Sequence, residues 1–359
     1  MKKQSAADLF EKELRERARQ VKTPLIGSFE ITGRCNFDCK MCYVHTMDHA
    51  YARKHELSTS QWIEIMDAAY DAGMFFAVIS GGECLLRSDF EELYLHLYNK
   101  GVRVTVLTNG SLITEERIRF FAEHKPKRLQ ISLYGSNDET YREVTGQGGF
   151  EKILNTLYAL REQNINLEVA VTPSKFLLND IENIISLLEE GGFTYSVNPY
   201  LIEPRESIER GSFKLDESEI LKVFRIINQA KGKAPAPIDL NELPKPGGYC
   251  DEVIHGIECN AGVISFAVTW DGYMIPCASI PQPRINLLEE GFANSWEKLR
   301  KHDSEVLQAA ECRNCAYKSV CARCPVIRSE NLYCGHCNES VCQLTVSRVR
   351  AGLATLSQS

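Results

Sequence analysis

The chain has 359 residues, 44% of them hydrophobic and 25% charged, as is usual for soluble globular proteins. Its formal net charge is −7 and its Lys and Arg residues do not cluster, so nucleic acid is not expected as a partner. No apolar run approaches the ~18–20 residues of a membrane span, and the N-terminus is too charged for a secretory signal; both features predict a cytoplasmic protein without a membrane partner.

Residues 1–23 predict a charged, amphipathic N-terminal helix. Beyond them, short runs rich in β-branched and aromatic residues alternate with helical patterns. The runs predict strands at 28–32, 75–80, 102–108, 128–134, 167–172 and 195–202. The helical patterns cover 59–72, 89–100, 115–123, 150–163, 180–190 and 216–230, with Ser58, Ser88 and Thr114 as expected N-caps.

Several of the predicted strands are apolar almost throughout, which is typical of a parallel sheet buried on both faces. Six consecutive β–α units predict an α/β fold, a partial (β/α)6 TIM-like barrel over 24–232, because a closed TIM barrel needs eight. A stretch rich in Pro and Gly, 233–248, predicts a linker, and the cysteine-rich segment 249–350 predicts a second, small domain.

The chain contains 14 cysteines, and the reducing thiol pool of a cytoplasm favours metal binding over disulfides. Cys35, Cys39 and Cys42 follow the first predicted strand with the spacing Cys-x3-Cys-x2-Cys. Three thiolates on one loop can hold three corners of an iron–sulfur cluster and leave the fourth iron open to a small ligand. The alternative is a structural zinc site completed by a histidine, namely His45, His49 or His55.

These three cysteines after a first strand resemble the Cx3CxΦC motif of the radical S-adenosylmethionine (SAM) superfamily, and the resemblance covers roughly 24–230. It implies that the amino and carboxylate groups of SAM chelate the open iron of a [4Fe–4S] cluster. The reduced cluster would cleave SAM to a 5′-deoxyadenosyl radical that abstracts a hydrogen atom. The residue before the third cysteine is usually aromatic in this family; here it is Met41, whose thioether is apolar and adaptable.

The segment SGGEC (80–84), at the end of the second predicted strand, is similar to the GGE motif of the same superfamily. Gly81 and Gly82 permit close backbone approach, and Glu83 is expected to accept a hydrogen bond from the SAM ammonium. Cys84 is either a redox-active catalytic thiol or a small buried side chain. The resemblance implies further cofactor contacts at Met41, Tyr43, Asn109, Ser132 and Arg142, of which the last two could instead be ordinary strand-end and surface residues.

The C-terminal cysteines follow the pattern Cys259-x12-Gly-x4-Cys277, then Cys312-x2-Cys315-x5-Cys321-x2-Cys324 and Cys342. This pattern resembles the SPASM extension of radical SAM enzymes, except that the last short gap has two residues rather than three. The resemblance implies two auxiliary [4Fe–4S] clusters. The distal one would be held by Cys312, Cys315, Cys321 and Cys342, and the proximal one by Cys259, Cys277 and Cys324, with Cys250 as a candidate fourth ligand.

Three alternatives remain open in this segment. The proximal site could be open at its fourth ligand, CGHC (334–337) could replace Cys342, and paired CxxC motifs also occur in zinc ribbons.

The resemblance implies an oxidoreductase that acts on a peptide or protein, most often by cross-linking, oxidising or epimerising a ribosomally made precursor, with a flavodoxin- or ferredoxin-type electron donor. Alternatives are dehydrogenation of an amino sugar or tetrapyrrole, and an anaerobic sulfatase maturase, although those carry Asp where this chain has Ala278. The alternative to an enzyme is a non-catalytic iron–sulfur scaffold protein. Candidate substrate-facing residues are Thr172, Tyr200, Glu203 and Arg205.

Overall fold

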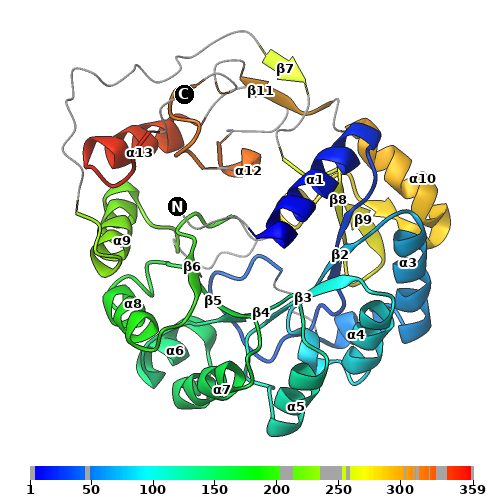
Figure 1. The fold of residues 1–359 in the computed structure, drawn as a ribbon, viewed down its shortest axis with the longest axis horizontal. Coiled ribbons are helices and arrows are strands. Elements are labelled where there is room, and N and C mark those ends of the chain that lie inside the picture. The colour runs from blue at the N-terminus through cyan, green and yellow to red at the C-terminus, as the bar shows by residue number, and fades with distance from the viewer. Residues whose placement is uncertain are drawn as a thin grey trace.

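The structure is a computed structural model that describes residues 5–44, 49–202, 213–234, 253–255, 259–302, 305–309, 312, 315–322, 324–328 and 338–356. Several residues singled out above lie outside these ranges: Cys250, Cys334, Cys337, His45, Glu203 and Arg205. Figure 1 shows helices arranged as an outer ring around a curved sheet, with the cysteine-rich C-terminal segment closing the remaining side.

The barrel part contains, in chain order, α1 (Ala6–Val21), β1 (Ile26–Glu30), α2 (His49–His55), α3 (Thr59–Asp71), β2 (Phe76–Ser80), a 3₁₀ turn η1 (Cys84–Leu86), α4 (Phe90–Asn99), β3 (Arg103–Thr108), α5 (Glu115–Glu123), β4 (Arg128–Ser132), α6 (Asp138–Thr145), α7 (Phe150–Glu162), β5 (Leu167–Val171), α8 (Ile181–Glu190), β6 (Tyr195–Val197) and α9 (Glu217–Ala230). The C-terminal part adds β7 (Val253–His255), β8 (Ser265–Val268), β9 (Tyr273–Ile275), β10 (Ile285–Asn286), α10 (Leu287–His302), β11 (Leu307–Ala309), α12 (Pro325–Arg328) and α13 (Glu339–Arg350).

The main sheet has the order β10-β9-β8-β1-β2-β3-β4-β5-β6, and β1 to β6 are all parallel. This confirms the predicted partial (β/α)6 barrel. Its core lies between the sheet and the surrounding helices and contains fully buried side chains such as Phe29, Ile79, Val106, Ile131 and Val169. The Phe29 ring, for example, packs edge-on against Trp62 of α3. β-Branched residues suit such a doubly covered sheet because their side chains pack well on the pleat.

The first residues of the helices show which of the predicted N-caps were correct. The Ser58 and Thr114 hydroxyls accept hydrogen bonds from backbone N–H groups in the first turns of α3 and α5, as predicted. The prediction of Ser88 as an N-cap was wrong, because α4 begins at Phe90 with Asp89 before it. The Asp89 carboxylate makes no cap; it binds Arg87 at 2.6 Å and accepts from the Thr59 hydroxyl at 2.6 Å.

In the described barrel part, two helices lie where no element was predicted, α2 and α6. The sequence signals for α6 are Asn137, whose side chain caps its first turn, and Gly146, which ends it in the left-handed region at φ 74°. The sixth strand is shorter than predicted and stops at Val197, two residues before Pro199.

Helix α1 covers the N-terminal ends of the strands. Ala18 is buried in a small apolar cluster with Leu25, Phe76 and Ile264, the first residues of neighbouring strands or the residues just before them. An ion pair between Glu11 and Lys127 adds a contact near the start of β4. The predicted N-terminal helix is therefore a packed part of the barrel.

The cysteine-rich segment continues the barrel sheet. Strand β8 pairs with β1 in parallel, from Ser265 opposite Ile26 to Val268 opposite Phe29, and β9 pairs with β8 in antiparallel fashion. Helix α13 packs on α9 through Leu344, which shares an apolar cluster with Ile220 and Val223. Sheet and helix contacts thus join the C-terminal segment to both edges of the barrel.

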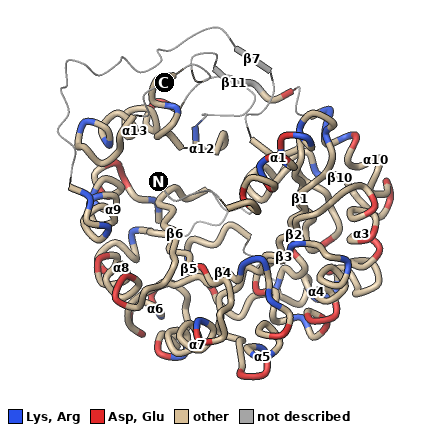
Figure 2. The backbone as a smooth tube through the Cα atoms, in the orientation of Figure 1, with Lys and Arg blue, Asp and Glu red and all other residues tan. Residues whose placement is uncertain are grey.

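Figure 2 shows Lys and Arg interspersed with Asp and Glu along the outer helices. Among the residues that the structure describes, no helix combines the length and apolar composition needed to cross a membrane.

Candidate active site

The loop that carries Cys35 is fixed by backbone hydrogen bonds to the GGE segment. The Gly82 N–H donates to the Thr32 carbonyl at 2.9 Å, and the Glu83 N–H donates to the Arg34 carbonyl at 2.8 Å. These bonds extend the pairing of β1 with β2 beyond the strands themselves. The first predicted ligand is therefore held directly on the end of the sheet.

The two glycines are required by this close approach. A Cβ atom at Gly82 would lie 2.4 Å from the Arg34 carbonyl oxygen, and one at Gly81 would lie 2.4 Å from the Thr32 carbonyl oxygen. Gly81 also has a φ of +147°, which side-chain-bearing residues rarely adopt. The sequence predicted that these glycines permit a close backbone approach, and the backbone that approaches them is that of the cysteine loop.

The far side of the cysteine loop rests on α6. The Asp38 N–H donates to the Thr145 carbonyl at 2.8 Å, and the Lys40 N–H donates to the Val144 carbonyl at 3.0 Å. The Phe37 ring packs edge-on against Tyr141 and against Tyr134 from the end of β4. A helix that was not predicted thus helps to shape the loop of the three cysteines.

The three thiols lie close together in a largely buried setting. The pKa of Cys35 is raised to about 12 and the pKa of Cys39 well above its usual range; burial is the main cause in both, and the neighbouring Cys42 sulfur contributes. The Phe37 N–H donates to the Cys35 sulfur at 3.4 Å, and the Tyr134 hydroxyl bonds to Cys39. Without iron the Cys35 and Cys39 thiols are neutral, so metal binding here must release protons.

This donor set fits a [4Fe–4S] cluster. In the part of the chain that the structure describes, no group of three or more His, Cys, Asp or Glu side chains converges closely enough to hold one metal ion. In a [4Fe–4S] cluster each thiolate binds a different iron, so three neighbouring but not convergent thiols suit it. His49 and His55 lie on α2, where the His55 ring stacks on Tyr51.

Glu83 is completely buried, and its carboxylate joins the ends of β2 and β3. It accepts from the Thr108 hydroxyl at 2.7 Å, the Asn109 N–H at 2.7 Å and the Leu85 N–H at 3.0 Å. Burial raises the pKa of Glu83, although the three donors oppose that effect. Its contact with the SAM ammonium stays a prediction, while these three partners give it a structural role that the sequence did not reveal.

The other predicted cofactor contacts fall into two groups. Asn109 lies at the cysteine loop, with its amide nitrogen 3.0 Å from the Asn36 side-chain oxygen and 3.9 Å from the Cys35 sulfur. Met41 is buried within that loop and Tyr43 is half-buried beside it. Ser132 is the half-buried last residue of β4. Arg142, by contrast, is exposed on α6 and pairs with Asp138 at 3.8 Å, and no described contact brings it to the cysteine loop.

Cys84 lies directly behind Glu83 and has no exposed surface. Its thiol donates to the Leu107 carbonyl at 3.3 Å, and burial raises its pKa well above the usual range. These contacts favour the small buried side chain over the catalytic thiol, which stays a prediction.

Residues 29–188 match the family model of the radical SAM superfamily. This segment is a radical SAM domain. Such a domain implies SAM and an iron–sulfur cluster as cofactors, and the residues described above fit both. The matched segment contains the three cysteines, the GGE segment and most of the parallel barrel.

Similar proteins act on different substrates. The chain is 29% identical to an AdoMet-dependent heme synthase of Methanosarcina barkeri, over 84% of this chain and 91% of that protein. It is 24% identical to the sporulation killing factor maturation protein SkfB of Bacillus subtilis, over 81% and 68%. A crystal structure of Streptococcus suis SuiB bound to precursor peptide SuiA has the same fold, with a TM-score of 0.66 and 18% identity over 94% of this chain and 82% of SuiB.

The likeness in fold to SuiB covers 94% of this chain and therefore extends into the cysteine-rich part. Of the predicted proximal ligands, Cys277 and Cys324 lie near enough to Cys259 to raise its pKa, which burial chiefly brings to about 11. Two of the thiols predicted for that cluster thus lie near Cys259, and the candidate fourth ligand, Cys250, lies outside the described residues.

Three of the four predicted distal ligands, Cys315, Cys321 and Cys342, lie around the start of α13. Cys315 and Cys342 both interact electrostatically with Tyr317. The Cys321 sulfur accepts a hydrogen bond at 3.6 Å from Thr345, which lies on α13 about one turn after Cys342. Cys312 is half-buried, and no contact that would place it with the other three is described.

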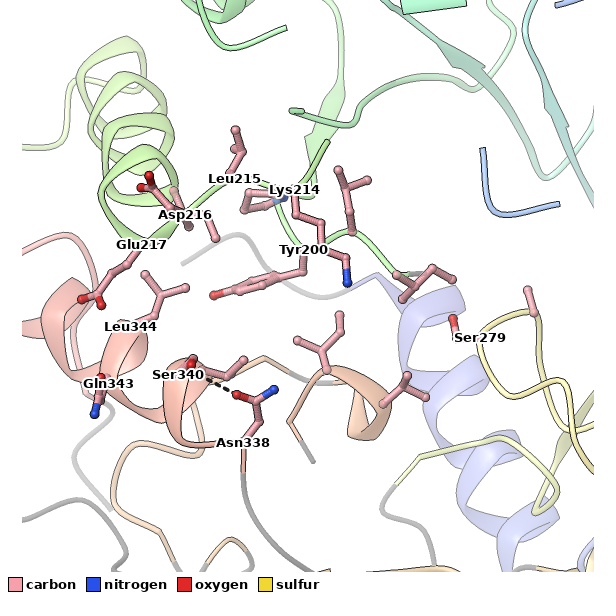
Figure 3. Close-up of a pocket in the computed structure, with 18 of the residues that line it drawn as sticks. Tyr200, Lys214, Leu215, Asp216, Glu217, Ser279, Asn338, Ser340, Gln343 and Leu344 are labelled. Atoms are coloured by element: carbon pink, nitrogen blue, oxygen red, sulfur yellow. Dashed lines mark hydrogen bonds between the residues drawn. The ribbon is translucent and has the colours of Figure 1, made fainter. Parts of the chain in front are cut away.

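A cavity of about 830 Å³ opens between the barrel and the cysteine-rich part (Figure 3). It is lined from the end of β6 and the start of α9 by Pro199, Tyr200, Leu201, Ile202, Lys214, Leu215, Asp216, Glu217 and Ile220, and from the C-terminal part by Ala278, Ser279, Pro281, Val326, Ile327, Asn338, Ser340, Val341, Gln343 and Leu344. Figure 3 shows Tyr200 reaching across this space toward α13.

The sequence anticipated only a small part of this cavity. Tyr200 was a candidate because it follows a strand, whereas Thr172, which follows β5, does not line the cavity. The opposite wall comes from α12 and α13, more than a hundred residues away in the chain. No local pattern signals such a meeting of distant segments.

Proposed function

We propose that this chain is a radical SAM/SPASM enzyme that modifies a peptide bound in the cavity between β6, α9, α12 and α13. Cys35, Cys39 and Cys42 hold the SAM-binding [4Fe–4S] cluster, and Gly81, Gly82, Glu83 and Asn109 shape its surroundings. When bound and reduced, this cluster with SAM supplies the 5′-deoxyadenosyl radical. Residues 24–232 form the catalytic barrel, and 249–350 hold the auxiliary clusters on the two ligand sets assigned above.

The cavity carries this proposal. It lies at the carboxyl end of β6, and the GGE segment lies at the carboxyl end of β2. Because β1 to β6 are parallel, both ends open on the same face of the barrel, where such folds place their chemistry. Its volume is within the ~300–1,000 Å³ of ordinary ligand pockets.

The lining favours a peptide over a tetrapyrrole. Both walls are largely apolar. The hydroxyl group of Tyr200 and the side-chain amides of Asn338 and Gln343 can form hydrogen bonds with a peptide backbone. The charged lining residues are one lysine, Lys214, and two acids, Asp216 and Glu217. A tetrapyrrole with several carboxylates would meet more negative than positive charge here. The maturation protein SkfB and the peptide-bound SuiB structure support the same choice.

A tetrapyrrole substrate is the second candidate, because the heme synthase of Methanosarcina barkeri matches this chain at 29% identity over 91% of its own length. A sulfatase-maturase function has less support. The position directly after Cys277, where those enzymes carry Asp, is Ala278, and it lines the cavity without a carboxylate.

The first test is reductive SAM cleavage. Anaerobically purified, reconstituted protein is reduced with dithionite and incubated with SAM, and 5′-deoxyadenosine is measured by liquid chromatography. We expect formation by the wild type and none by the C35A/C39A/C42A variant. Equal, background amounts in both would identify a non-catalytic scaffold.

The second test separates the two substrate classes. A displayed library of random dodecapeptides is selected against wild type, Ser340→Trp, which fills the cavity, and Glu339→Trp, an exposed control on the same helix. We expect wild type and the control to enrich the same peptides and Ser340→Trp to lose them, and the enriched peptides to change mass in the SAM reaction. Binding of Fe-coproporphyrin III that only Ser340→Trp abolishes would favour the tetrapyrrole instead.

A further inference from the structure

Arg348 is a single side chain that joins four segments of the molecule. Its guanidinium donates to the Val320 carbonyl at 3.0 Å and to the Tyr200 hydroxyl at 3.2 Å, and it lies 3.8 Å above the ring of Phe224. These contacts connect α13 to the turn before Cys321, to the end of β6 and to α9. Its Nε is buried and has no hydrogen-bond partner among the described residues.

The cysteine next to this guanidinium is also tied to α13. The Cys321 N–H donates to the Tyr317 carbonyl at 2.9 Å, which closes the turn that ends at Val320 and Cys321. The Thr345 hydroxyl donates to the Cys321 sulfur at 3.6 Å. Thr345 and Arg348 are three residues apart on one helix and so share a face, which places the sulfur and the guanidinium side by side.

The same guanidinium reaches the wall of the cavity. Tyr200 lines the cavity, and its hydroxyl accepts from Arg348 and lies within electrostatic reach of the Cys321 sulfur. The stacking on Phe224 shields the cation from water on one face. A charge that is partly withdrawn from water acts on its neighbours more strongly than a solvated one.

We propose that Arg348 is a positioning residue that holds the Cys321 turn beside the substrate cavity and whose charge raises the reduction potential of the auxiliary cluster ligated by Cys321. The proposal rests on the proposed function only in assigning an iron–sulfur cluster to the distal ligand set. Reduction adds one negative charge to a cluster, and a nearby cation stabilises the more negative form. Removal of that cation must therefore make the cluster harder to reduce.

The experiment measures the potential directly, without substrate or SAM. The C35A/C39A/C42A background removes the first cluster, so that electron paramagnetic resonance during a redox titration reports the auxiliary clusters alone. Arg348→Gln is compared with Arg348→Lys, which keeps the charge, and with Arg119→Gln, an exposed residue on α5 of the barrel. Iron and sulfide contents are measured for every variant.

We expect Arg348→Gln to lower one auxiliary potential so that the reduced-to-oxidised ratio at fixed potential falls about tenfold, equivalent to about 59 mV for one electron. Arg348→Lys should recover most of that change, and Arg119→Gln should show none. If Arg348→Gln folds too poorly to hold iron, Arg348→Met retains the contact with Phe224 and makes the same comparison. Equal potentials in the neutral variant and Arg119→Gln, or zinc in place of auxiliary iron, would overturn the proposal.

Discussion

Glu83 is the buried carboxylate on which the ends of β2 and β3 converge. Its two oxygens receive three hydrogen bonds, from Thr108, Asn109 and Leu85, and none of its surface is exposed. A carboxylate only accepts hydrogen bonds, so it suits a site where several donors meet. The backbone N–H groups of Gly82 and Glu83 donate hydrogen bonds to the cysteine loop. A shift of Glu83 would therefore also shift the loop that carries Cys35.

We expect Glu83→Gln to lower the free energy of unfolding by about 1–3 kcal/mol, because an amide turns an NH₂ donor toward at least one of the three donors and leaves it unsatisfied. Urea unfolding of cluster-free protein measures this. Glu92→Gln, an exposed position on α4, is the control and should change stability by less than about 0.5 kcal/mol. Equal effects of the two substitutions would show that the buried bonds contribute little.

Helix α1 makes contacts that its own sequence pattern did not predict. Its charged composition predicted an amphipathic helix, but the structure shows what its apolar face covers, namely the N-terminal ends of the strands around Phe76 and Ile264. It also reaches the cysteine-rich part, since Arg19 donates to the Asn260 side chain at 2.6 Å and to the Cys259 carbonyl at 3.3 Å. The helix therefore braces the loop of a predicted auxiliary-cluster ligand.

We expect Ala18→Asp to destabilise the protein by at least about 2 kcal/mol, because it places a carboxylate without a partner in the apolar cluster beneath α1. Gln20→Asp puts the same charge on the exposed side of the same last turn, so both variants share any unfavourable interaction with the helix dipole. Thermal unfolding compares them. A melting temperature as low for Gln20→Asp as for Ala18→Asp would contradict the packing role.

At the scale of the whole molecule, the barrel and the cysteine-rich part share one sheet and one cavity. Strand β8 extends the barrel beside β1, and α13 packs on α9 at the opposite edge. Auxiliary clusters placed in this part would lie next to the proposed substrate cavity, since Ala278 follows Cys277 and lines it. The iron and sulfide content of the protein therefore tests whether the cysteine-rich part holds auxiliary clusters.

We expect anaerobically reconstituted protein to contain about twelve iron and twelve sulfide per chain, as three [4Fe–4S] clusters require, and the C35A/C39A/C42A variant to contain about eight of each. Plasma mass spectrometry and a sulfide assay give both counts. About four iron together with zinc would show that the C-terminal cysteines form zinc sites and would refute the auxiliary clusters.

The sequence by itself determined the alternation of strands and helices, the cysteine triad after the first strand, the GGE segment after the second and the cysteine spacing near the C-terminus. These features are local or periodic, so they can be seen without knowing which segments meet. Only the tertiary structure decided the partners of Glu83, the support of the cysteine loop by α6, the joining of β8 to β1 and the contact of Arg348 with Tyr200, 148 residues away. Such contacts depend on packing between distant segments, which no short stretch of sequence specifies.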